Sequence, residues 1–366
     1  MSHTPKSTRK KICLVTISLA NGGAERCTAL LSTLLYQEGF EVHIVCLTQH
    51  IDYEYSGNLF CLYAQKNNSL PQRFSRFKKY LQKEQFDCIL DSRTRSSNVK
   101  EFLYLHYLYK ANKVIYVVHS YNLSEYFPPS KLLTKAMINK SEAIVSVSKA
   151  ISEKINTKFP SSKNKYIYNP ISEEGISTDL PKTEKSAEKY ILYLGRIQES
   201  VKNLSLLLDA YKASNLAQKN IRLKILGDGP DLHLVKSKTT ELSLDTHVEL
   251  IPYTPHVTPY LKSALFQVLT SRYEGFPRVL IEALAVGTPV VSVDCKSGPN
   301  EIICHEHNGL LVENYNVTKL ANAFNRFIDD KELYLHCKKN AKSSVAHLKP
   351  NIIAKKWTEL LTSLHK

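Results

Sequence analysis

Short apolar runs rich in β-branched residues alternate with helical patterns along most of this chain. In its first half the apolar runs lie at residues 12–17, 42–47, 86–90, 114–118, 143–147 and 166–168. Helical periodicity separates most of these runs, most clearly at residues 24–38, 72–85 and 130–140. Strands connected through helices run in the same direction, so this alternation predicts a parallel sheet built from strand–helix units.

A second alternating series begins near residue 190, with apolar runs at residues 190–194, 221–226, 248–251, 266–269 and 290–293. A chain of 366 residues is long enough for two domains. We therefore expect an α/β protein with two doubly wound, Rossmann-like domains, at residues 1–170 and 189–350, facing each other across a cleft. Residues 171–188 lack periodicity and predict a linker. Residues 351–366 predict a final helix that carries Trp357 and docks on another surface, with the first domain as a candidate.

The net charge of +15 is concentrated in the first half, where residues 1–169 hold 24 Lys and Arg against 12 Asp and Glu. This excess favours an anionic partner, and a phosphate-bearing substrate, an anionic lipid or a nucleic acid would each satisfy it. The sequence has no recognisable nucleic-acid-binding module, so we expect no nucleic acid among the partners.

The eight cysteines are scattered without a Cys-x-x-Cys pair, which is typical of buried free thiols in a reducing compartment. The apolar run at residues 12–20 is followed by Asn-Gly-Gly and lacks a cleavage site of small residues. No run approaches the roughly 18 apolar residues of a membrane span. We therefore expect a cytoplasmic protein. Cys304, His305 and His307 lie close together, but their spacing matches no standard zinc pattern, so we expect no metal and no cofactor.

The segment at residues 271–292 carries the most chemical information, and it reads SRYEGFPRVLIEALAVGTPVVS. The pattern predicts a loop that carries Glu274, followed by a helix with Pro277 at its first position and Gly287 at its end. Glu282 then falls in the second turn of the helix. The start of such a helix offers free backbone N–H groups and the positive end of a dipole, which together favour a bound anion.

Two cations follow the first predicted strand of the second domain. Arg196 and Lys202 lie in the sequence GRIQESVKN at residues 195–203. Arginine can engage phosphate oxygens through two parallel hydrogen bonds, and lysine adds a compact positive charge. Open parallel sheets bind ligands at the carboxyl ends of their strands, where both loops are expected. The residues therefore predict a diphosphate site, and an ordinary solvated loop is the alternative for the two cations.

The pattern EGFP-x-VLIEALA-x-G-x-PVVS, which contains Glu274 and Glu282, closely resembles that of retaining glycosyltransferase family 4. Further matches follow in the family's order, at GGAER (22–26), GR (195–196), KN (202–203), GDGP (227–230), SGPNE (297–301) and NG (308–309). The resemblance spans nearly the whole chain. It implies the GT-B fold, a nucleoside diphosphate sugar donor, and a metal-independent hexosyl transfer that retains the anomeric configuration.

The resemblance also implies roles for individual residues. Arg196 and Lys202 would hold the diphosphate and stabilise its leaving charge, Glu274 would contact the transferred sugar, and Glu282 would bind the ribose hydroxyls. His119 follows the strand at residues 114–118 and resembles a family histidine that contacts the donor sugar; a histidine bonded to its own loop is the alternative. The predicted catalytic residues are Glu274, Arg196, Lys202 and His119. The predicted donor-binding residues are Gly22, Gly23, Arg196, Lys202, Glu274, Gly275, Phe276, Pro277, Arg278, Val279 and Glu282.

Residues 297–303 and Asn169-Pro170 resemble bacterial members that make lipid-linked or surface polysaccharides, such as lipopolysaccharide or capsule. The implied partners are a uridine diphosphate sugar and a glycan or lipid-linked acceptor at the inner face of the cell membrane. A dehydrogenase is disfavoured because no GxGxxG follows the first strand. A GT-B sugar-nucleotide epimerase and a catalytically inactive partner subunit remain as alternatives.

Residues 73–83 predict an amphipathic helix that lies on an anionic membrane surface. Its apolar face contains Phe74, Phe77, Tyr80 and Leu81. Its basic residues are Arg73, Arg76, Lys78, Lys79 and Lys83, and Lys131, Lys135 and Lys140 extend the basic surface. A helix packed on its own sheet, with a solvated basic side, is the alternative.

Overall fold

A computed structural model describes residues 9–62, 69–171 and 188–364 of the chain. Apart from its two end residues, the linker predicted at 171–188 lies outside the described residues.

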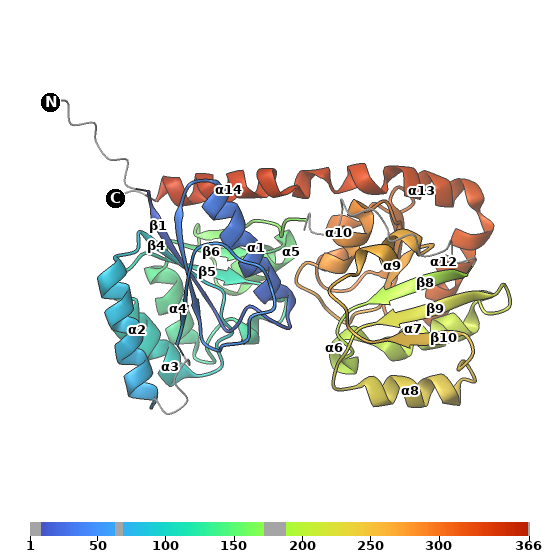
Figure 1. Ribbon diagram of the computed structural model, residues 1–366, viewed down its shortest axis with the longest axis horizontal. Helices are drawn as coiled ribbons and strands as arrows, with labels where there is room; N and C mark the ends of the chain where they lie inside the picture. Colours follow the sequence, from blue (N-terminus) through green and yellow to red (C-terminus); the bar gives the residue numbers. More distant parts are fainter. Residues whose placement is uncertain (1–8, 63–68, 172–187, 365–366) are drawn as a thin grey trace. The chain divides into compact units, whose positions relative to one another are not determined.

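The chain divides into two compact units, one formed by residues 1–170 with 350–366 and the other by residues 171–349. Each unit is a parallel sheet with helices packed on it (Figure 1). This architecture confirms the predicted α/β class with two Rossmann-like domains.

The first unit has a seven-stranded sheet in the order β3-β2-β1-β4-β5-β6-β7. Its elements are β1 (Lys11–Thr16), α1 (Gly23–Gln37), β2 (Glu41–Cys46), β3 (Asn58–Cys61), α2 (Leu70–Glu84), β4 (Cys88–Asp91), α3 (Asn98–Leu103), the π-helical turn η1 (Tyr104–Leu108), β5 (Val114–Val118), the 3₁₀ turn η2 (Leu123–Glu125), α4 (Lys131–Lys140), β6 (Ala143–Ser146), α5 (Lys149–Lys158), β7 (Asn164–Tyr166) and α14 (Pro350–Ser363). In the parallel register, Leu14 of β1 is opposite Ile44 of β2 on one side and Leu90 of β4 on the other. The chain order therefore reverses between β1 and β4.

The second unit has a six-stranded sheet in the order β10-β9-β8-β11-β12-β13. Its elements are β8 (Lys189–Leu194), α6 (Glu199–Lys202), α7 (Leu204–Ala213), β9 (Ile221–Leu226), α8 (Leu232–Glu241), β10 (Val248–Ile251), α9 (Thr258–Ser263), β11 (Gln267–Leu269), α10 (Arg278–Ala285), β12 (Val290–Val293), α11 (Pro299–Ile302), β13 (Gly309–Val312), α12 (Val317–Asp329), α13 (Lys331–Ser344) and the 3₁₀ turn η3 (Ala346–Leu348). Leu192 of β8 is opposite Lys224 of β9 and Gln267 of β11, so the chain order reverses between β8 and β11.

The central strands are continuous apolar runs because helices cover both faces of a parallel sheet. Ile191 and Tyr193 of β8, on one face of the sheet, are fully buried with Leu207 of α7 and Phe324 of α12. The edge strands have weaker patterns. The edge strand β3 is half-exposed and is not among the predicted strands, and β7 begins two residues before the run predicted at 166–168. The register with β6, which places Ser146 opposite Tyr166, sets the position of β7.

Helix α2 turns its apolar side into the first unit, and this corrects the expected insertion of that side into a membrane. Phe74, Phe77 and Leu81 are buried, and the Tyr80 ring stacks on Phe60 at a centroid distance of 4.1 Å. The helix is thus packed on its own domain, in agreement with the alternative interpretation. Lys79 and Lys83 are still exposed, so a role for the basic side of α2 stays a prediction.

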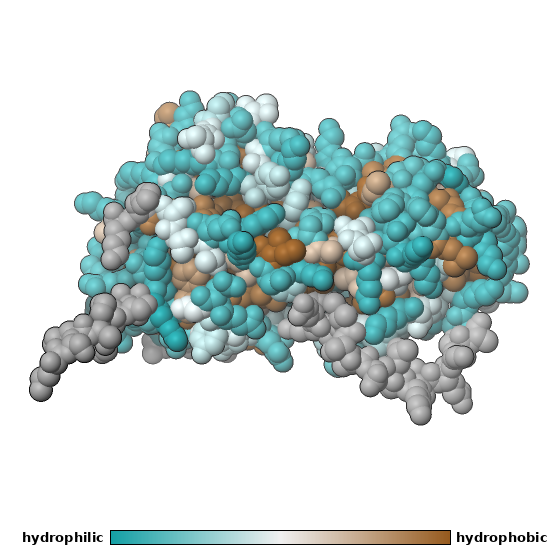
Figure 2. Space-filling model, turned by 90° about the horizontal axis from the view of Figure 1, so that it is seen from above, coloured by the Kyte–Doolittle hydropathy of each residue, from teal (hydrophilic) through white to brown (hydrophobic). Residues whose placement is uncertain are grey.

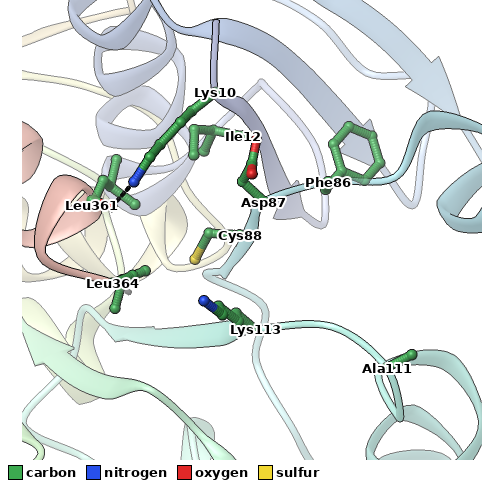
Figure 3. A pocket seen from close by; sticks show the side chains of 9 residues that line it. All are labelled: Lys10, Ile12, Phe86, Asp87, Cys88, Ala111, Lys113, Leu361 and Leu364. Atoms are coloured by element: carbon green, nitrogen blue, oxygen red, sulfur yellow. Dashed lines mark hydrogen bonds between the residues drawn. The ribbon is translucent and has the colours of Figure 1, made fainter. Parts of the chain in front are cut away.

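Helix α14 packs on α1 of the first unit and buries Trp357 and Leu361. Ile352 and Lys356 of the same helix are exposed. Near the end of the helix, Lys10 Nζ donates a hydrogen bond to the Leu361 carbonyl oxygen at 3.1 Å beside a cavity of about 200 Å³ (Figure 3). This cavity lies at the amino ends of β1 and β4, the edge of the sheet opposite to the one where such folds bind ligands.

Hydrophilic side chains dominate the surface seen in Figure 2. Within the described residues, no helix combines the length and the apolar character that crossing a bilayer requires.

Candidate active site

The carboxyl ends of β8 and β11 adjoin at the centre of the second unit's sheet. β9 and β10 continue on one side of this pair, and β12 and β13 continue on the other. The strand order thus reverses between β8 and β11, and the loops that follow these two strands diverge. Open α/β sheets bind ligands in the crevice between such loops. Arg196 and Lys202 follow β8, and Glu274 follows β11. The topology therefore brings the predicted cations and the predicted glutamate to the same edge of the sheet.

Lys202 and Glu274 are in direct contact. Lys202 Nζ lies 2.6 Å from Glu274 Oε1, and the two side chains are only 21% and 12% exposed. The Ser271 hydroxyl donates a second hydrogen bond to the same oxygen at 2.6 Å. The Thr270 hydroxyl donates to the Lys202 carbonyl oxygen at 3.0 Å and so fixes the end of α6 against the β11 loop. An ammonium group has three donors, so Lys202 can hold Glu274 and still bind an anion.

The loop after β12 supports the Glu274 loop. The Glu274 N–H donates to the Lys296 carbonyl oxygen at 2.8 Å, and the Ser297 hydroxyl donates to the Gly275 carbonyl oxygen at 2.9 Å. Gly298 has a φ of +98°, and a Cβ there would lie 2.4 Å from Pro277 Cδ. Only glycine permits this close approach, which explains the residue within the SGPNE motif.

Helix α10 starts one residue later than predicted. Pro277 has an extended ψ of 100° and is the N-cap, so the helix begins at Arg278. The predicted end is correct, since Gly287 follows the helix with a φ of +91°. The first turn of a helix has N–H groups without carbonyl partners inside the helix, and here Val279 lies in that turn. Glu282 lies in the second turn, where its Oε1 accepts a hydrogen bond from Arg278 at 2.9 Å.

Arg196 differs from Lys202 in its surroundings. Its side chain is exposed and has no polar partner among the described residues, while its carbonyl oxygen accepts a hydrogen bond from Tyr193 at 3.1 Å. The GDGP loop packs against this segment, because a Cβ on Gly229 would lie 2.0 Å from the Ile197 carbonyl oxygen. The Ile197 N–H also donates to the Asp228 carbonyl oxygen at 2.8 Å. The backbone that presents Arg196 is therefore held while its guanidinium is available.

The remaining predicted residues belong to the first unit. Gly22 is the N-cap of α1 and Gly23 is the first residue of that helix, so both follow β1 at the carboxyl edge of the sheet. His119 directly follows β5 at the same edge. Both ring nitrogens of His119 are buried without a hydrogen-bond partner among the described residues, which corrects the alternative of a histidine bonded to its own loop. Burial, and then the positive charge of Arg95, lower the pKa of His119 to about 4, so the ring is neutral at pH 7.

A buried network of charges at the same edge was missed by sequence reasoning. Arg93 and Arg95 follow β4, with Arg93 2.8 Å and Arg95 3.1 Å from the Asp91 carboxylate, and Arg93 also contacts Glu101 at 3.4 Å. Burial alone would raise the pKa of Asp91, but the charges of Arg93 and Arg95 outweigh it and lower that pKa. Arg95 also donates to the Tyr126 carbonyl oxygen at 3.0 Å. The network thus ties the β4 loop to the segment that follows His119.

The sequence does contain a signal for this network. Asp91, Arg93 and Arg95 alternate directly after a buried strand at the point where the strand order reverses. Charged residues are almost never fully buried unless they are paired, so the pattern alone would be assigned to the surface.

Three groups with metal-ligand chemistry, Glu41, His43 and Glu84, adjoin within the described part of the chain. Lys11 Nζ lies 2.9 Å from Glu41 and 3.3 Å from Glu84, so an ammonium group already balances the two carboxylates. The group lies away from the loops described above, at the amino ends of β1 and β2. His305, the neighbour of Cys304 in the second unit, accepts the Leu311 N–H on Nδ1 at 3.0 Å.

Solved structures with the same fold include the Anabaena protein HepE in complex with UDP and glucose. It is 19% identical to this chain and has a TM-score of 0.77, and the match covers 97% of this chain and 100% of HepE. The two-unit architecture is therefore that of the GT-B class.

Two family models account for the two units. The model for glycosyltransferase family 4 matches residues 21–174, and the model for glycosyl transferases group 1 matches residues 177–344. The chain belongs to the glycosyltransferases that combine these two domains.

Curated relatives span nearly the whole chain. The amylovoran biosynthesis glycosyltransferase AmsD of Erwinia amylovora is 25% identical over 356 residues, which cover 96% of this chain and 99% of AmsD. The N-acetylgalactosamine-N,N'-diacetylbacillosaminyl-diphospho-undecaprenol 4-alpha-N-acetylgalactosaminyltransferase of Campylobacter jejuni is 28% identical over 357 residues, which cover 91% of this chain and 94% of that enzyme.

Proposed function

We propose that this glycosyltransferase moves a hexose or N-acetylhexosamine from a nucleoside diphosphate sugar, with UDP as the expected nucleotide, to a glycan or lipid-linked acceptor. We place the reaction in the synthesis of a bacterial surface polysaccharide such as lipopolysaccharide or capsule. The names of the Erwinia and Campylobacter relatives support this pathway, and the bound UDP of HepE supports the nucleotide.

The observation that carries the proposal is the contact between Lys202 and Glu274 at the reversal of the strand order. Transfer breaks the bond between the anomeric carbon and the diphosphate, and negative charge then develops on the leaving phosphate. Fixed positive charge at that point lowers the barrier most, because it is already oriented before the reaction. Lys202, Arg196 and the first-turn amides of α10 supply such charge from the protein itself, so we propose that the reaction needs no metal.

The two glutamates would bind the rest of the donor. Glu274 is held by Lys202 and by Ser271, which leaves its second carboxylate oxygen for a sugar hydroxyl. Glu282, four residues into α10, would bind the ribose hydroxyls beyond the diphosphate. Glu274 would thus link the position of the sugar to the position of the cation that stabilises its leaving group.

The first unit would contribute His119 and the backbone around Gly22 and Gly23. A neutral imidazole has one donor and one acceptor nitrogen, and both are buried here without a partner among the described residues. Leaving two such atoms without hydrogen bonds is costly, so we propose that His119 bonds a sugar hydroxyl when the donor is present. Glycines 22 and 23 would let the α1 N-terminus approach the ligand closely.

The transfer would retain the anomeric configuration. We propose that the departing diphosphate oxygen accepts the proton of the acceptor hydroxyl while that hydroxyl attacks from the same face of the sugar. No protein nucleophile is then required, and the task of the chain is to hold the donor, the acceptor and the developing charge. A lipid-linked acceptor would place the protein at the inner face of the cell membrane, as a peripheral protein bound to its anionic surface.

Donor binding tests the proposal in the absence of any acceptor. Thermal unfolding should be measured with UDP and with UDP-linked glucose, galactose, N-acetylglucosamine and N-acetylgalactosamine. A ligand at 100 times its Kd stabilises the folded state by about 2.7 kcal/mol, and we expect this for UDP and for one of the sugars. Lys202→Ala should make the shift smaller, whereas Lys338→Ala, an exposed lysine of α13, should preserve it. If no nucleotide shifts the transition of the parent protein, the proposed donor is wrong.

A further inference from the structure

Large apolar side chains are exposed on neighbouring helices of the first unit. Val99 and Phe102 of α3 are 72% and 54% exposed, and Leu132 of α4 is 80% exposed. Val99 and Leu132 are the two most exposed large apolar side chains in the part of the chain that the structure describes. In α3 the buried residue is Glu101, which occupies the side of the helix that faces the domain, so Val99 and Phe102 are left on the exposed side.

These side chains form one surface, because α3 and α4 lie side by side. At one end the Ser130 N–H donates to Asn98 Oδ1 at 2.9 Å, and at the other Lys140 Nζ lies 3.3 Å from Nδ1 of His106 in η1, the turn that follows α3 directly. We call this surface, which contains Val99, Phe102, Leu132, Lys100, Lys131 and Lys135, the α3–α4 face. Scattered exposed apolar residues are ordinary, but a cluster on adjoining helices marks an interaction surface.

The charge of the α3–α4 face has a single sign. Lys100, Lys131 and Lys135 are exposed. The only acidic residues in α2, α3, η1 and α4 are Glu84, which is paired with Lys11 at 3.3 Å, and Glu101, which is buried against Arg93. These four elements therefore present exposed cations without an exposed carboxylate.

We infer that the α3–α4 face docks this protein on an anionic lipid bilayer. Val99, Phe102 and Leu132 enter the boundary between headgroups and acyl chains, and the three lysines contact lipid phosphates. Helices that combine aliphatic or aromatic side chains with lysines on one surface bind membranes in this way. A nucleic acid would use the lysines but has no need of exposed Val99 and Leu132. The inference deepens the proposed function, on which it rests for the location of the acceptor, and it replaces the buried apolar side of α2 as the inserted part.

Sedimentation with vesicles tests the inference independently of turnover. The parent protein should bind vesicles that contain phosphatidylglycerol, and it should bind pure phosphatidylcholine vesicles far more weakly. Two triple variants separate the contributions: Val99→Ser with Phe102→Ser and Leu132→Ser, and Lys100→Gln with Lys131→Gln and Lys135→Gln. A matched control of similar composition on the second unit is Leu234→Ser, Leu335→Ser, Lys236→Gln, Lys338→Gln and Lys339→Gln, all at exposed positions.

Each lysine near an anionic leaflet contributes roughly fivefold to the partition coefficient, so the lysine variant should bind on the order of a hundredfold more weakly. The vesicle affinity of the serine variant should fall by at least the same factor, on anionic and on neutral vesicles, while the control should bind like the parent. All variants change exposed side chains and should keep the parent melting temperature.

The inference is overturned if the parent does not sediment with anionic vesicles, or if either variant sediments as well as the control. Retarded migration of a single-stranded RNA by a parent that ignores vesicles would assign the lysines to nucleic acid instead. Release of UDP from the free donor should be the same in the parent and in both variants. If the parent binds vesicles but releases no UDP, the proposed function is refuted, whereas the assignment of the α3–α4 face as a membrane-binding surface still holds.

Discussion

Replacing Lys202 with alanine removes the ammonium group that lies 2.6 Å from Glu274 Oε1. Loss of one preorganised charge donor to a developing anion lowers kcat by roughly 10²–10³-fold, equivalent to about 2.7–4 kcal/mol in the activation free energy. Stability should fall less. The pair is only 21% and 12% exposed, which places its contribution between that of surface pairs and that of fully buried pairs, at about 1–3 kcal/mol. Glu274 also keeps the Ser271 hydroxyl at 2.6 Å.

The assay is release of UDP at saturating donor, together with the melting temperature of each variant. Lys202→Arg keeps the charge in a different shape and should recover part of the rate, because the guanidinium still offers donors to a phosphate. Lys338→Ala is the matched control and should change neither quantity. Arg196→Ala should lower kcat by a similar factor but leave the melting temperature unchanged, since its side chain is exposed and unpaired among the described residues. Turnover near the parent value in both Lys202→Ala and Arg196→Ala would refute the diphosphate assignment.

Three further outcomes follow from the site. Activity should persist in excess EDTA, because protein cations balance the diphosphate; a complete loss that magnesium restores would show that a metal is required. The His119 pKa of about 4 lies below its usual value of 6.5, so the folded state binds this proton more weakly than the unfolded chain. The neutral ring therefore contributes its full share of the unfolding free energy above about pH 6.5, and this share is lost as the pH falls toward 4. His119→Gln should therefore flatten the unfolding free energy over that range in urea titrations, and an unchanged pH profile would count against the buried neutral ring. Gly298→Ala should lower the melting temperature and raise the donor KM because its Cβ would meet Pro277, whereas Gly39→Ala, at a φ of +88° with open space around it, should show only the backbone cost and leave KM unchanged.

Much of the second unit could be predicted from local patterns, because strong signals agree there. The run after Glu274 has helical periodicity, a proline before it and Gly287 after it, and α10 lies within one residue of its expected start. From the sequence, Lys202 and Glu274 could be predicted only to lie at the same edge of the sheet. Their contact depends on the strand order β8-β11, which brings together residues that lie 72 positions apart.

The buried charges of the first unit could not be predicted in the same way. Arg95 can be fully buried because it pairs with Asp91, four residues before it, and donates a hydrogen bond to the Tyr126 carbonyl oxygen, which belongs to the next strand–helix unit. The alternation of Asp91, Arg93 and Arg95 is a local signal, but it does not reveal the contact with Tyr126, and arginines without a known partner are expected at the surface. The same reasoning explains α2, whose amphipathic pattern is equally compatible with a membrane and with the rings of Tyr104 and Tyr109, against which Phe77 packs.

The most direct test of the account is turnover of the donor by the parent and by Glu274→Gln, a variant that keeps the shape of the side chain and removes its charge. Each UDP-sugar of the panel should be incubated with the protein and a lipid-linked acceptor fraction, and the product should be followed by the NMR signal of its anomeric proton. We predict that one UDP-sugar is consumed, that the α configuration of its sugar is kept in the product, and that Glu274→Gln lowers the rate at least about 100-fold. Consumption of no donor, an inverted product, or equal rates for the parent and Glu274→Gln would contradict the account.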